Sequence, residues 1–478
     1  MATLEARIPA GHPLRLRWEI TRISYLFEQG SYRAAFEQAS ALLSAIGPEV
    51  DPRQVIRLHL QIGKTAQVLN ELAEGTAHLR RAQELAAACG DTEAEITALG
   101  NLAIYHHLAG DFAAARAEYS RVGQLCEQHG LIMAGLVASA NLAALEQSVG
   151  NLAAAISGYE RAIASSERYA AADPPDLENL AEICIQVGAF ARAEALLARA
   201  DTLWRERGGS PALTRCRQVM LAIARQQFAE GRAQLAATRQ INAAGDDSRV
   251  AGEIFLWQAL IDLEQGRPAL IAPGLDQASA LYDTMGVSFY AALIAALRAL
   301  GAARQGQLER ARAALCQAEA ALAQSASTIV DPRYLMGLAA EILGDAPRAA
   351  ALLHAAWQRL QAQAANLPPD LSAQLMAAPF SRRVLWAARR HTAGRGLITL
   401  PHKTAPTGRP LHAWEQVAIL WELPEGAASC RDRTARQRIL QELIAQARDQ
   451  EAEPTLAALA QALHVSPATV SRDLKALR

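Results

Sequence analysis

A short turn motif recurs along most of this chain at an almost constant step. Gly110-Asp111-Phe112 is echoed by Gly150-Asn151-Leu152, and shorter copies occur on both sides of these two. The turn positions are residues 30, 70, 110, 150, 188, 226, 266, 306 and 344, so successive turns are 38 or 40 residues apart. A fixed step of this length indicates stacked repeat units. We therefore expect about nine copies of one unit over residues 14–365.

Each unit has the pattern of two helices. Glycine at the turn can take the left-handed conformation that ends a helix without a Cβ clash. Apolar residues recur at helical spacing, as at Leu99, Leu102 and Ala103. Apolar residues make up 51% of the chain and aromatic residues only 5%, which favours closely packed helices over a β-sandwich. The predicted fold class is all-α, a superhelix of helix pairs that stack because no pair can bury its apolar stripe alone.

The units carry a further set of recurring residues. Asn101-Leu102-Ala103, Gly110, Phe112, Ala115 and Tyr119 of one unit recur as Asn141-Leu142-Ala143, Gly150, Leu152, Ala155 and Tyr159 in the next. On these residues the segment 14–365 resembles the tetratricopeptide repeat (TPR) family. The resemblance implies a solenoid that binds partners and does not catalyse a reaction.

The same resemblance implies that the inner face of the first helices binds the partner. Asn101, Asn141 and Asn179 each lie nine residues before a turn glycine, and Arg217 and Trp257 take that place in later units. A side-chain amide can hold the backbone of an extended peptide, so these five residues are the candidate peptide- or protein-binding groove. The alternative is that the asparagines satisfy backbone groups between neighbouring helices.

The segment 431–478 has the pattern of three short helices. Arg433 to Asp449 is amphipathic, Thr455 caps a second helix, and Ser466 caps a third that begins at Pro467. The residues predicted to face the core of this unit are Ile439, Leu440, Leu443, Ile444, Ala447, Leu456, Leu459, Ala460, Leu463, Val470, Leu474 and Leu477.

Residues 455–478, and above all the run from Val465 to Leu474, resemble the helix-turn-helix module of the DeoR-type bacterial repressors and related winged-helix regulators. The resemblance implies that Ser466, Thr469, Ser471, Arg472 and Lys475 contact DNA bases or phosphates. His464 stands where the turn usually has glycine, so we expect a positive φ there. Long helical repeats before such a module are also similar to the output half of bacterial signal-transduction ATPases.

The region between repeats and tail has its own pattern. Residues 366–393 are expected to form a capping helix that starts at Pro368-Pro369, and residues 394–430 a linker in which 397–400 and 417–423 form short strands. Residues 1–13 are an N-terminal lead. Arg382-Arg383 and Arg389-Arg390 either contact DNA phosphates or lie on a solvated helix face.

Charge is distributed unevenly between body and tail. Residues 381–478 contain 15 Arg or Lys and 9 Asp or Glu, a net charge of +6, which leaves −7 for residues 1–380 because the whole chain carries −1. A basic tail on an acidic body is typical of a tail that binds a polyanion.

Other chemistry finds no support in the sequence. Gly63-Lys64-Thr65 lacks the glycine that a phosphate-binding loop needs five residues earlier, since position 58 is Leu. The six Cys residues are scattered without a C-x-x-C pair, and neither an apolar run of membrane-spanning length nor a leader pattern occurs. We expect a cytoplasmic protein with no enzymatic activity, no metal, no cofactor and no membrane association.

These patterns together predict a DNA-binding transcriptional regulator. Its expected partners are double-stranded DNA, a peptide or protein in the solenoid groove, and a second copy of the chain in a homodimer. The alternative is a TPR interaction scaffold whose tail docks a protein instead of DNA.

Overall fold

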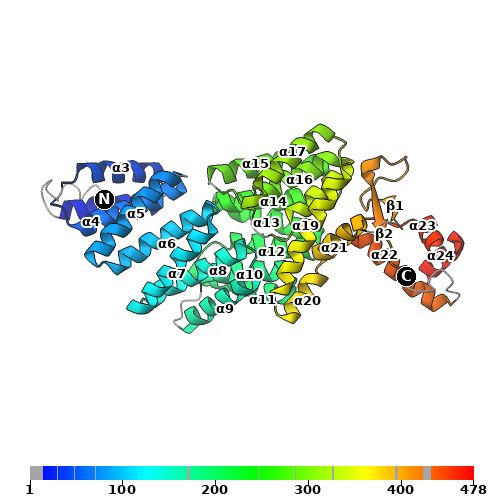
Figure 1. The fold of residues 1–478 in the computed structure, drawn as a ribbon, viewed down its shortest axis with the longest axis horizontal. Coiled ribbons are helices and arrows are strands. Elements are labelled where there is room, and N and C mark those ends of the chain that lie inside the picture. The colour runs from blue at the N-terminus through cyan, green and yellow to red at the C-terminus, as the bar shows by residue number, and fades with distance from the viewer. Residues whose placement is uncertain are drawn as a thin grey trace. The chain divides into compact units, whose positions relative to one another are not determined.

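The computed structural model describes residues 14–28, 31–47, 49–69, 71–168, 173–245, 247–285, 287–325, 328–392, 397–423 and 432–477. The chain divides into a first unit, residues 1–180 with 280–288, and a second unit, residues 181–279 with 289–478. Helices dominate both units (Figure 1), so the all-α prediction is confirmed. The lead 1–13, the turn positions 30 and 70, and the linker residues 394–396 and 424–430 lie outside the described residues.

The first unit is built from consecutive helix pairs. Its helices are α2 (Leu14–Glu28), α3 (Tyr32–Ala45), α4 (Pro52–Val68), α5 (Leu72–Cys89), α6 (Thr92–Leu108), α7 (Phe112–His129), α8 (Ile132–Ser148), α9 (Leu152–Arg168) and the start of α10 (Pro174–Gln186). Local residues fix where these helices begin and end: Asp91 accepts a 3.2 Å bond from the backbone N–H of Ala94, and Gly130 closes α7 with a φ of 67°.

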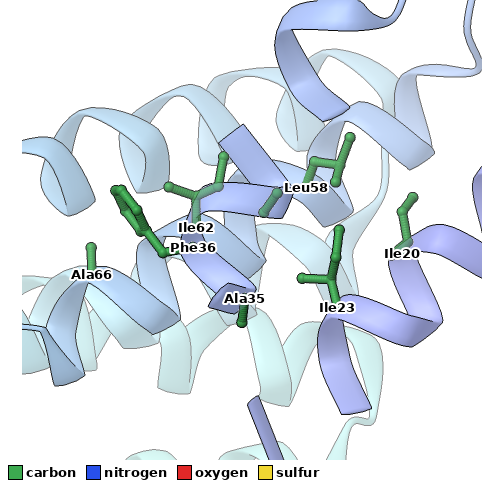
Figure 2. Close-up of a cluster of buried hydrophobic side chains, with 8 residues drawn as sticks. Ile20, Ile23, Ala35, Phe36, Leu58, Ile62 and Ala66 are labelled. Atoms are coloured by element: carbon green, nitrogen blue, oxygen red, sulfur yellow. The ribbon is translucent and has the colours of Figure 1, made fainter. Parts of the chain in front are cut away.

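Apolar side chains from three successive helices form one core at the start of this unit (Figure 2). We call it the N-terminal cluster: Ile20, Ile23, Ala35, Phe36, Ala39, Leu58, Ile62 and Ala66. Its members come from α2, α3 and α4, so the pair α2–α3 buries its apolar stripe together with the next helix. This is the stacking that the repeat pattern predicts.

The turn positions inferred from the 38–40-residue step are confirmed wherever they are described. Their φ values are positive at Gly110, Gly150, Gly188, Gln226, Gly266, Gly306 and Gly344. Gln226 is the informative case, because a residue with a Cβ adopts a φ of 62° there. The repeat register therefore imposes the left-handed turn even where the sequence lacks glycine.

The second unit continues the pairs and adds a hairpin and five further α-helices. Its repeat helices are the end of α10, α11 (Phe190–Arg207), α12 (Ala212–Ala224), α13 (Phe228–Gly245), α14 (Ser248–Glu264), the 3-10 turn η1 (Pro268–Leu270), α15 (Ile271–Thr284, shared with the first unit), α16 (Ala291–Ala303), α17 (Leu308–Ala321), η2 (Leu322–Gln324), α18 (Pro332–Ile342) and α19 (Ala346–Ala365). Beyond them lie α20 (Pro369–Ala377), α21 (Pro379–Thr392), β1 (Leu397–Pro401), η3 (Ala413–Glu415), β2 (Gln416–Leu420), α22 (Arg433–Asp449), α23 (Leu456–Ala462) and α24 (Pro467–Lys475).

After the repeats, the structure differs from the sequence prediction in the capping helix and adds the register of the two strands. The single capping helix is two helices, because Ala378 before Pro379 is extended with ψ at 142° and so ends α20. Strands β1 and β2 pair antiparallel, with Leu397 opposite Leu420 and Leu400 opposite Val417.

Candidate functional site

Helix α24 presents a polar face to solvent. Ser466, Arg472 and Lys475 are exposed, while Thr469 and Ser471 are half-buried. Ser466 caps the helix by accepting a 3.2 Å bond from the Thr469 backbone N–H, and the two hydroxyl oxygens are 2.9 Å apart. The Thr469 hydroxyl is therefore engaged in the cap, which leaves Arg472 and Lys475 as the exposed charges of this face.

The opposite face of α24 is fixed to α22. Val470 is fully buried, and the Asp473 carboxylate is 2.6 Å from Arg436 Nε and 3.4 Å from Arg433 Nε. Gln437 donates a 3.3 Å bond to the Asp473 carbonyl oxygen. Asp473 has no role in the sequence prediction, although an acidic residue three positions after a core valine on a basic helix could have indicated this anchor.

The turn before α24 has the expected geometry, and two core predictions are wrong. His464 has a φ of 51°, as its place at the turn requires. Leu456 is 46% exposed and Leu477 is 37% exposed, whereas both were expected in the core. Leu456 is the first residue of α23 and Leu477 follows the end of α24, so neither has a neighbouring turn to cover it.

The five predicted groove residues fall into two groups. Asn101, Asn141 and Asn179 are half-buried, and Asn101 donates its amide to the Thr97 carbonyl oxygen of its own helix at 2.7 Å. Arg217 and Trp257 are wrong as groove residues, because they are 1% and 0% exposed and offer no surface to a ligand.

Arg217 instead joins three consecutive first helices. Its Nε is 2.7 Å from Glu182 Oε2 on α10, and its Nη1 is 2.5 Å from Glu253 Oε2 on α14. Trp257 packs edge-on against Tyr290, with ring centroids 6.5 Å apart. These contacts make Arg217 and Trp257 structural residues of the second unit.

A second set of charges, buried or half-buried, joins the repeats to the hairpin and to the end of α22. We call it the junction cluster: Glu264, Arg304, Arg383, Lys403 and Glu451. Arg383 Nη1 lies 2.9 Å and 3.0 Å from the two Glu264 oxygens and 3.3 Å from Glu451 Oε1. Lys403 Nζ is 2.7 Å from Glu264 Oε2, and Arg304 Nη2 is 3.2 Å from Glu451 Oε2.

The junction cluster holds its carboxylates in the charged form. Burial alone would raise the pKa of Glu451, but Lys403, Arg304 and Arg383 lower that pKa well below its ordinary value. Burial likewise opposes ionisation of Glu264, and Arg383 and Lys403 lower its pKa. Glu451 also has a φ of 63°, a conformation in which glycine is usual at a helix end. The backbone thus tolerates strain to place this carboxylate.

The hairpin region is packed on the repeats by contacts as well as charges. A Cβ added at Gly266 would lie 2.5 Å from Thr404 Cβ, and one at Gly306 would lie 3.1 Å from the Trp414 ring. Lys403 donates its backbone N–H to the Glu451 carbonyl oxygen at 2.7 Å. Where the sequence suggested a linker, residues 402–414 therefore cover two repeat turns.

The paired arginines of α21 divide between a buried and an exposed position, so the solvated helix face expected for all four is found only at Arg382 and Arg389. Arg383 and Arg390 are buried, 2% and 5% exposed, and Arg390 Nη2 is 3.0 Å from both oxygens of Glu341. Neither can contact DNA phosphates from there. Arg382 and Arg389 are exposed and pair with Asp449 and Glu422.

Two further findings concern the described part of the chain. Within it, no three His, Cys, Asp or Glu side chains converge as a metal site would require. None of its helices combines the length and apolar character needed to cross a bilayer.

Comparison with known proteins gives likenesses of structure. No protein-family model and no curated protein matches the sequence. A signal transduction ATPase with a tetratricopeptide repeat sensor from Pyrococcus horikoshii matches over 55% of this chain and 41% of its own, with 16% identity and a TM-score of 0.42. This chain thus spans less than half the length of that protein.

Two regulators also match. The Rap conjugation gene regulator of the plasmid pLS20, in complex with the Phr* peptide, matches over 57% of this chain and 74% of its own, with 14% identity and a TM-score of 0.46. The apo form of the quorum sensor NprR from B. thuringiensis matches over 68% and 91%, with 13% identity and a TM-score of 0.48. The likeness concerns helical-repeat architecture and says nothing about the ligand or activity of this chain.

Proposed function

We propose that this protein is a non-enzymatic, cytoplasmic transcriptional regulator whose C-terminal helices α22–α24 form a DNA-binding helix-turn-helix. The observation that carries the proposal is the two-sided nature of α24. One face exposes Ser466, Arg472 and Lys475, and the other is fixed by Val470 and Asp473. A rigidly held helix with an exposed basic face is what insertion into the major groove requires.

The exposed side chains suit distinct contacts with DNA. The Arg472 guanidinium can donate two bonds to a guanine edge, whereas Lys475 suits a phosphate. Ser466 lies at the N-terminus of a nine-residue helix, where backbone N–H groups favour a phosphate. Ser471 is half-buried beside Arg472 and completes the candidate surface.

A single three-helix module would bind DNA weakly. Few phosphate contacts give about micromolar affinity at physiological salt. Two modules on a homodimer can engage two half-sites one helical turn apart, which supplies the missing affinity. The proposal therefore includes a homodimer on a two-fold symmetric operator.

The repeats would bind a peptide or protein that controls the DNA module. Asn101, Asn141 and Asn179 recur at equivalent, half-buried places on three first helices. Side-chain amides at such places can bond the backbone of an extended peptide. Of the predicted groove residues, these three remain in the proposal.

Selection from random-sequence duplex with the full chain, at two salt concentrations, tests DNA binding directly. We expect enrichment of a two-fold symmetric motif. The double variant Arg472→Ala with Lys475→Ala should lose that enrichment, because one good base contact contributes about 1–3 kcal/mol.

The matched control removes two exposed arginines from α22, Arg438→Ala with Arg448→Ala, for the same change in charge. It should weaken retention on all sequences and keep the motif. Equal losses in the two double variants would show that only net charge attracts DNA. No retention of the wild type at either salt would reject the proposal.

One observation favours the alternative that the tail docks a protein. Leu456 and Leu477 are exposed apolar residues on the three-helix unit. If Leu456→Ser with Leu477→Ser abolishes capture of a protein partner while DNA selection yields no motif, the protein is an interaction scaffold.

A further inference from the structure

A cavity of about 310 Å³ lies between the last repeat helices and the hairpin, within the second unit. Its apolar wall includes Leu300, Leu338, Ile342, Trp414 and Val417. Its polar wall includes Arg304, Glu341, His391, His402 and Glu451. An apolar pocket of this size with a few convergent polar groups is typical of small-molecule sites.

One polar side chain in this wall, His402, has a ring nitrogen without a hydrogen-bond partner in the described part of the chain. The Thr404 backbone N–H donates to His402 Nδ1 at 3.2 Å, and the Thr404 hydroxyl oxygen lies 2.8 Å from the same nitrogen. A backbone N–H can only donate and a hydroxyl can donate as well, so we assign Nδ1 as the accepting nitrogen. Burial lowers the pKa of His402, so the ring is neutral and its proton is on Nε2.

His402 is 7% exposed, and its buried Nε2 has no hydrogen-bond partner among the described residues. The nearest carboxylate oxygen, Oε2 of Glu451, is 3.9 Å away, which is too far for a hydrogen bond. A buried, unpaired donor is costly, and a ligand atom that accepts its proton would remove that cost.

The charges around the cavity favour an acidic ligand. The carboxylates Glu264, Glu341 and Glu451 are all held in ion pairs by the cations Arg304, Arg383, Arg390 and Lys403. Four cations face three carboxylates, so this set has one positive charge more than it has negative charges. Buried charges are stable when they are balanced, so one further negative charge fits here.

We propose that this cavity binds a small monocarboxylate with an apolar body. The carboxylate accepts the Nε2 proton of His402 and lies beside the Arg304 guanidinium, which has donors beyond its two bonds to Glu451 and the Leu263 carbonyl. The apolar body packs against Leu338 and Trp414. The site does not depend on DNA binding.

The probe is 3-phenylpropanoate, with the neutral 3-phenylpropanamide as its isostere, titrated calorimetrically into the full chain at pH 7. The acid should bind at least about tenfold more tightly than the amide, since a charged hydrogen bond is about twice as strong as a neutral one. His402→Phe removes the donor and should abolish this preference. Val417→Phe leaves the donor in place, fills the cavity and should abolish binding of both compounds.

His354→Phe is the matched control, because His354 is exposed on α19 and does not line the cavity. It should bind the acid as the wild type does. Equal affinity for acid and amide, unchanged binding in Val417→Phe, or no binding of the acid at millimolar concentration would each overturn the proposal. Val417→Phe keeps the test decisive if His402→Phe fails to fold.

Discussion

The N-terminal cluster and the junction cluster hold helices together by opposite means. In the first unit, α2, α3 and α4 meet through apolar side chains such as Ile23, Leu58 and Ile62, which are at most 1% exposed. In the second unit, the repeats meet the hairpin and α22 through five charged side chains, of which Arg383, Glu264 and Glu451 are at most 6% exposed.

The difference shows what each kind of contact can specify. Apolar stacking has no direction, so the same contact can repeat from pair to pair along the array. A buried ion pair gains little net energy over an apolar pair, but loss of one partner leaves an uncompensated charge. The junction is therefore built for one arrangement of hairpin and repeats, whereas the N-terminal stacking tolerates many sequences.

Acidification should give the largest difference in stability between the two regions, because it protonates several carboxylates together. The pKa values of Glu264, Glu341 and Glu451 lie below the ordinary value of 4.5, although burial alone would raise them. Their stabilisation is complete above pH 4.5 and is lost as the pH falls through the lowered pKa values.

Hydrogen exchange, corrected for the intrinsic effect of pH, measures this. We expect amides of β1 and β2 to lose protection on acidification before those of α2–α4, since the N-terminal cluster has no titratable member. Simultaneous loss in both regions would contradict the comparison.

Removal of one junction carboxylate should have the next largest effect. Glu264→Leu leaves Arg383 and Lys403 undercompensated, and we expect a loss of about 3–5 kcal/mol in the local opening free energy of the hairpin. Glu264→Leu with Arg383→Met should recover much of that loss. Glu309→Leu is the control, because the Glu309–Arg312 pair is exposed and contributes at most about 1 kcal/mol.

Truncation of a leucine in the N-terminal cluster should destabilise that region by about as much as truncation of an average buried leucine does. Leu58 is 0% exposed, so Leu58→Ala should lower the opening free energy of α2–α4 by about 3 kcal/mol. The loss should be the same at pH 7 and at acid pH, whereas the effect of Glu264→Leu should shrink in acid. A pH-dependent effect of Leu58→Ala would mean that charges also stabilise this region.

A comparison of two glycines with similar backbone conformations measures how tightly the hairpin packs on the repeats. Gly130 has a φ of 67° with open space where a Cβ would lie, and Gly266 has a φ of 72° with Thr404 Cβ 2.5 Å from that place. Gly130→Ala should lower the stability by about 1 kcal/mol, because a residue with a Cβ is strained at positive φ. Gly266→Ala should lower the stability by more than this and should also lower the hydrogen-exchange protection of the β1 amides. Equal losses of stability in the two variants would show that Thr404 moves away freely.

Local features of the fold could be predicted from the sequence. The seven described turns have positive φ, and Thr455, Ser466 and Pro467 begin helices as their chemistry requires. Caps, turns and apolar periodicity depend on residues close together in the chain, so they can be predicted without knowledge of tertiary contacts. Of the candidate DNA-binding face, the exposure of Arg472 and Lys475 followed from that periodicity.

Burial of polar groups could not be predicted in the same way. Arg217 occupies the same place in its unit as Asn101, yet only the helices on either side supply Glu182 and Glu253. The sequence pattern aligned Arg217 with Asn101 and could not show that carboxylates cover it.

By itself, the sequence determined the repeat step, the all-α class and the three C-terminal helices, because each depends on interactions between near neighbours. Only the tertiary structure decided the junction cluster. Its partners are far apart in the chain, 119 residues for Arg383 and Glu264 and 147 for Arg304 and Glu451. Coulomb attraction between such groups depends on distance and burial in space, which no local pattern encodes.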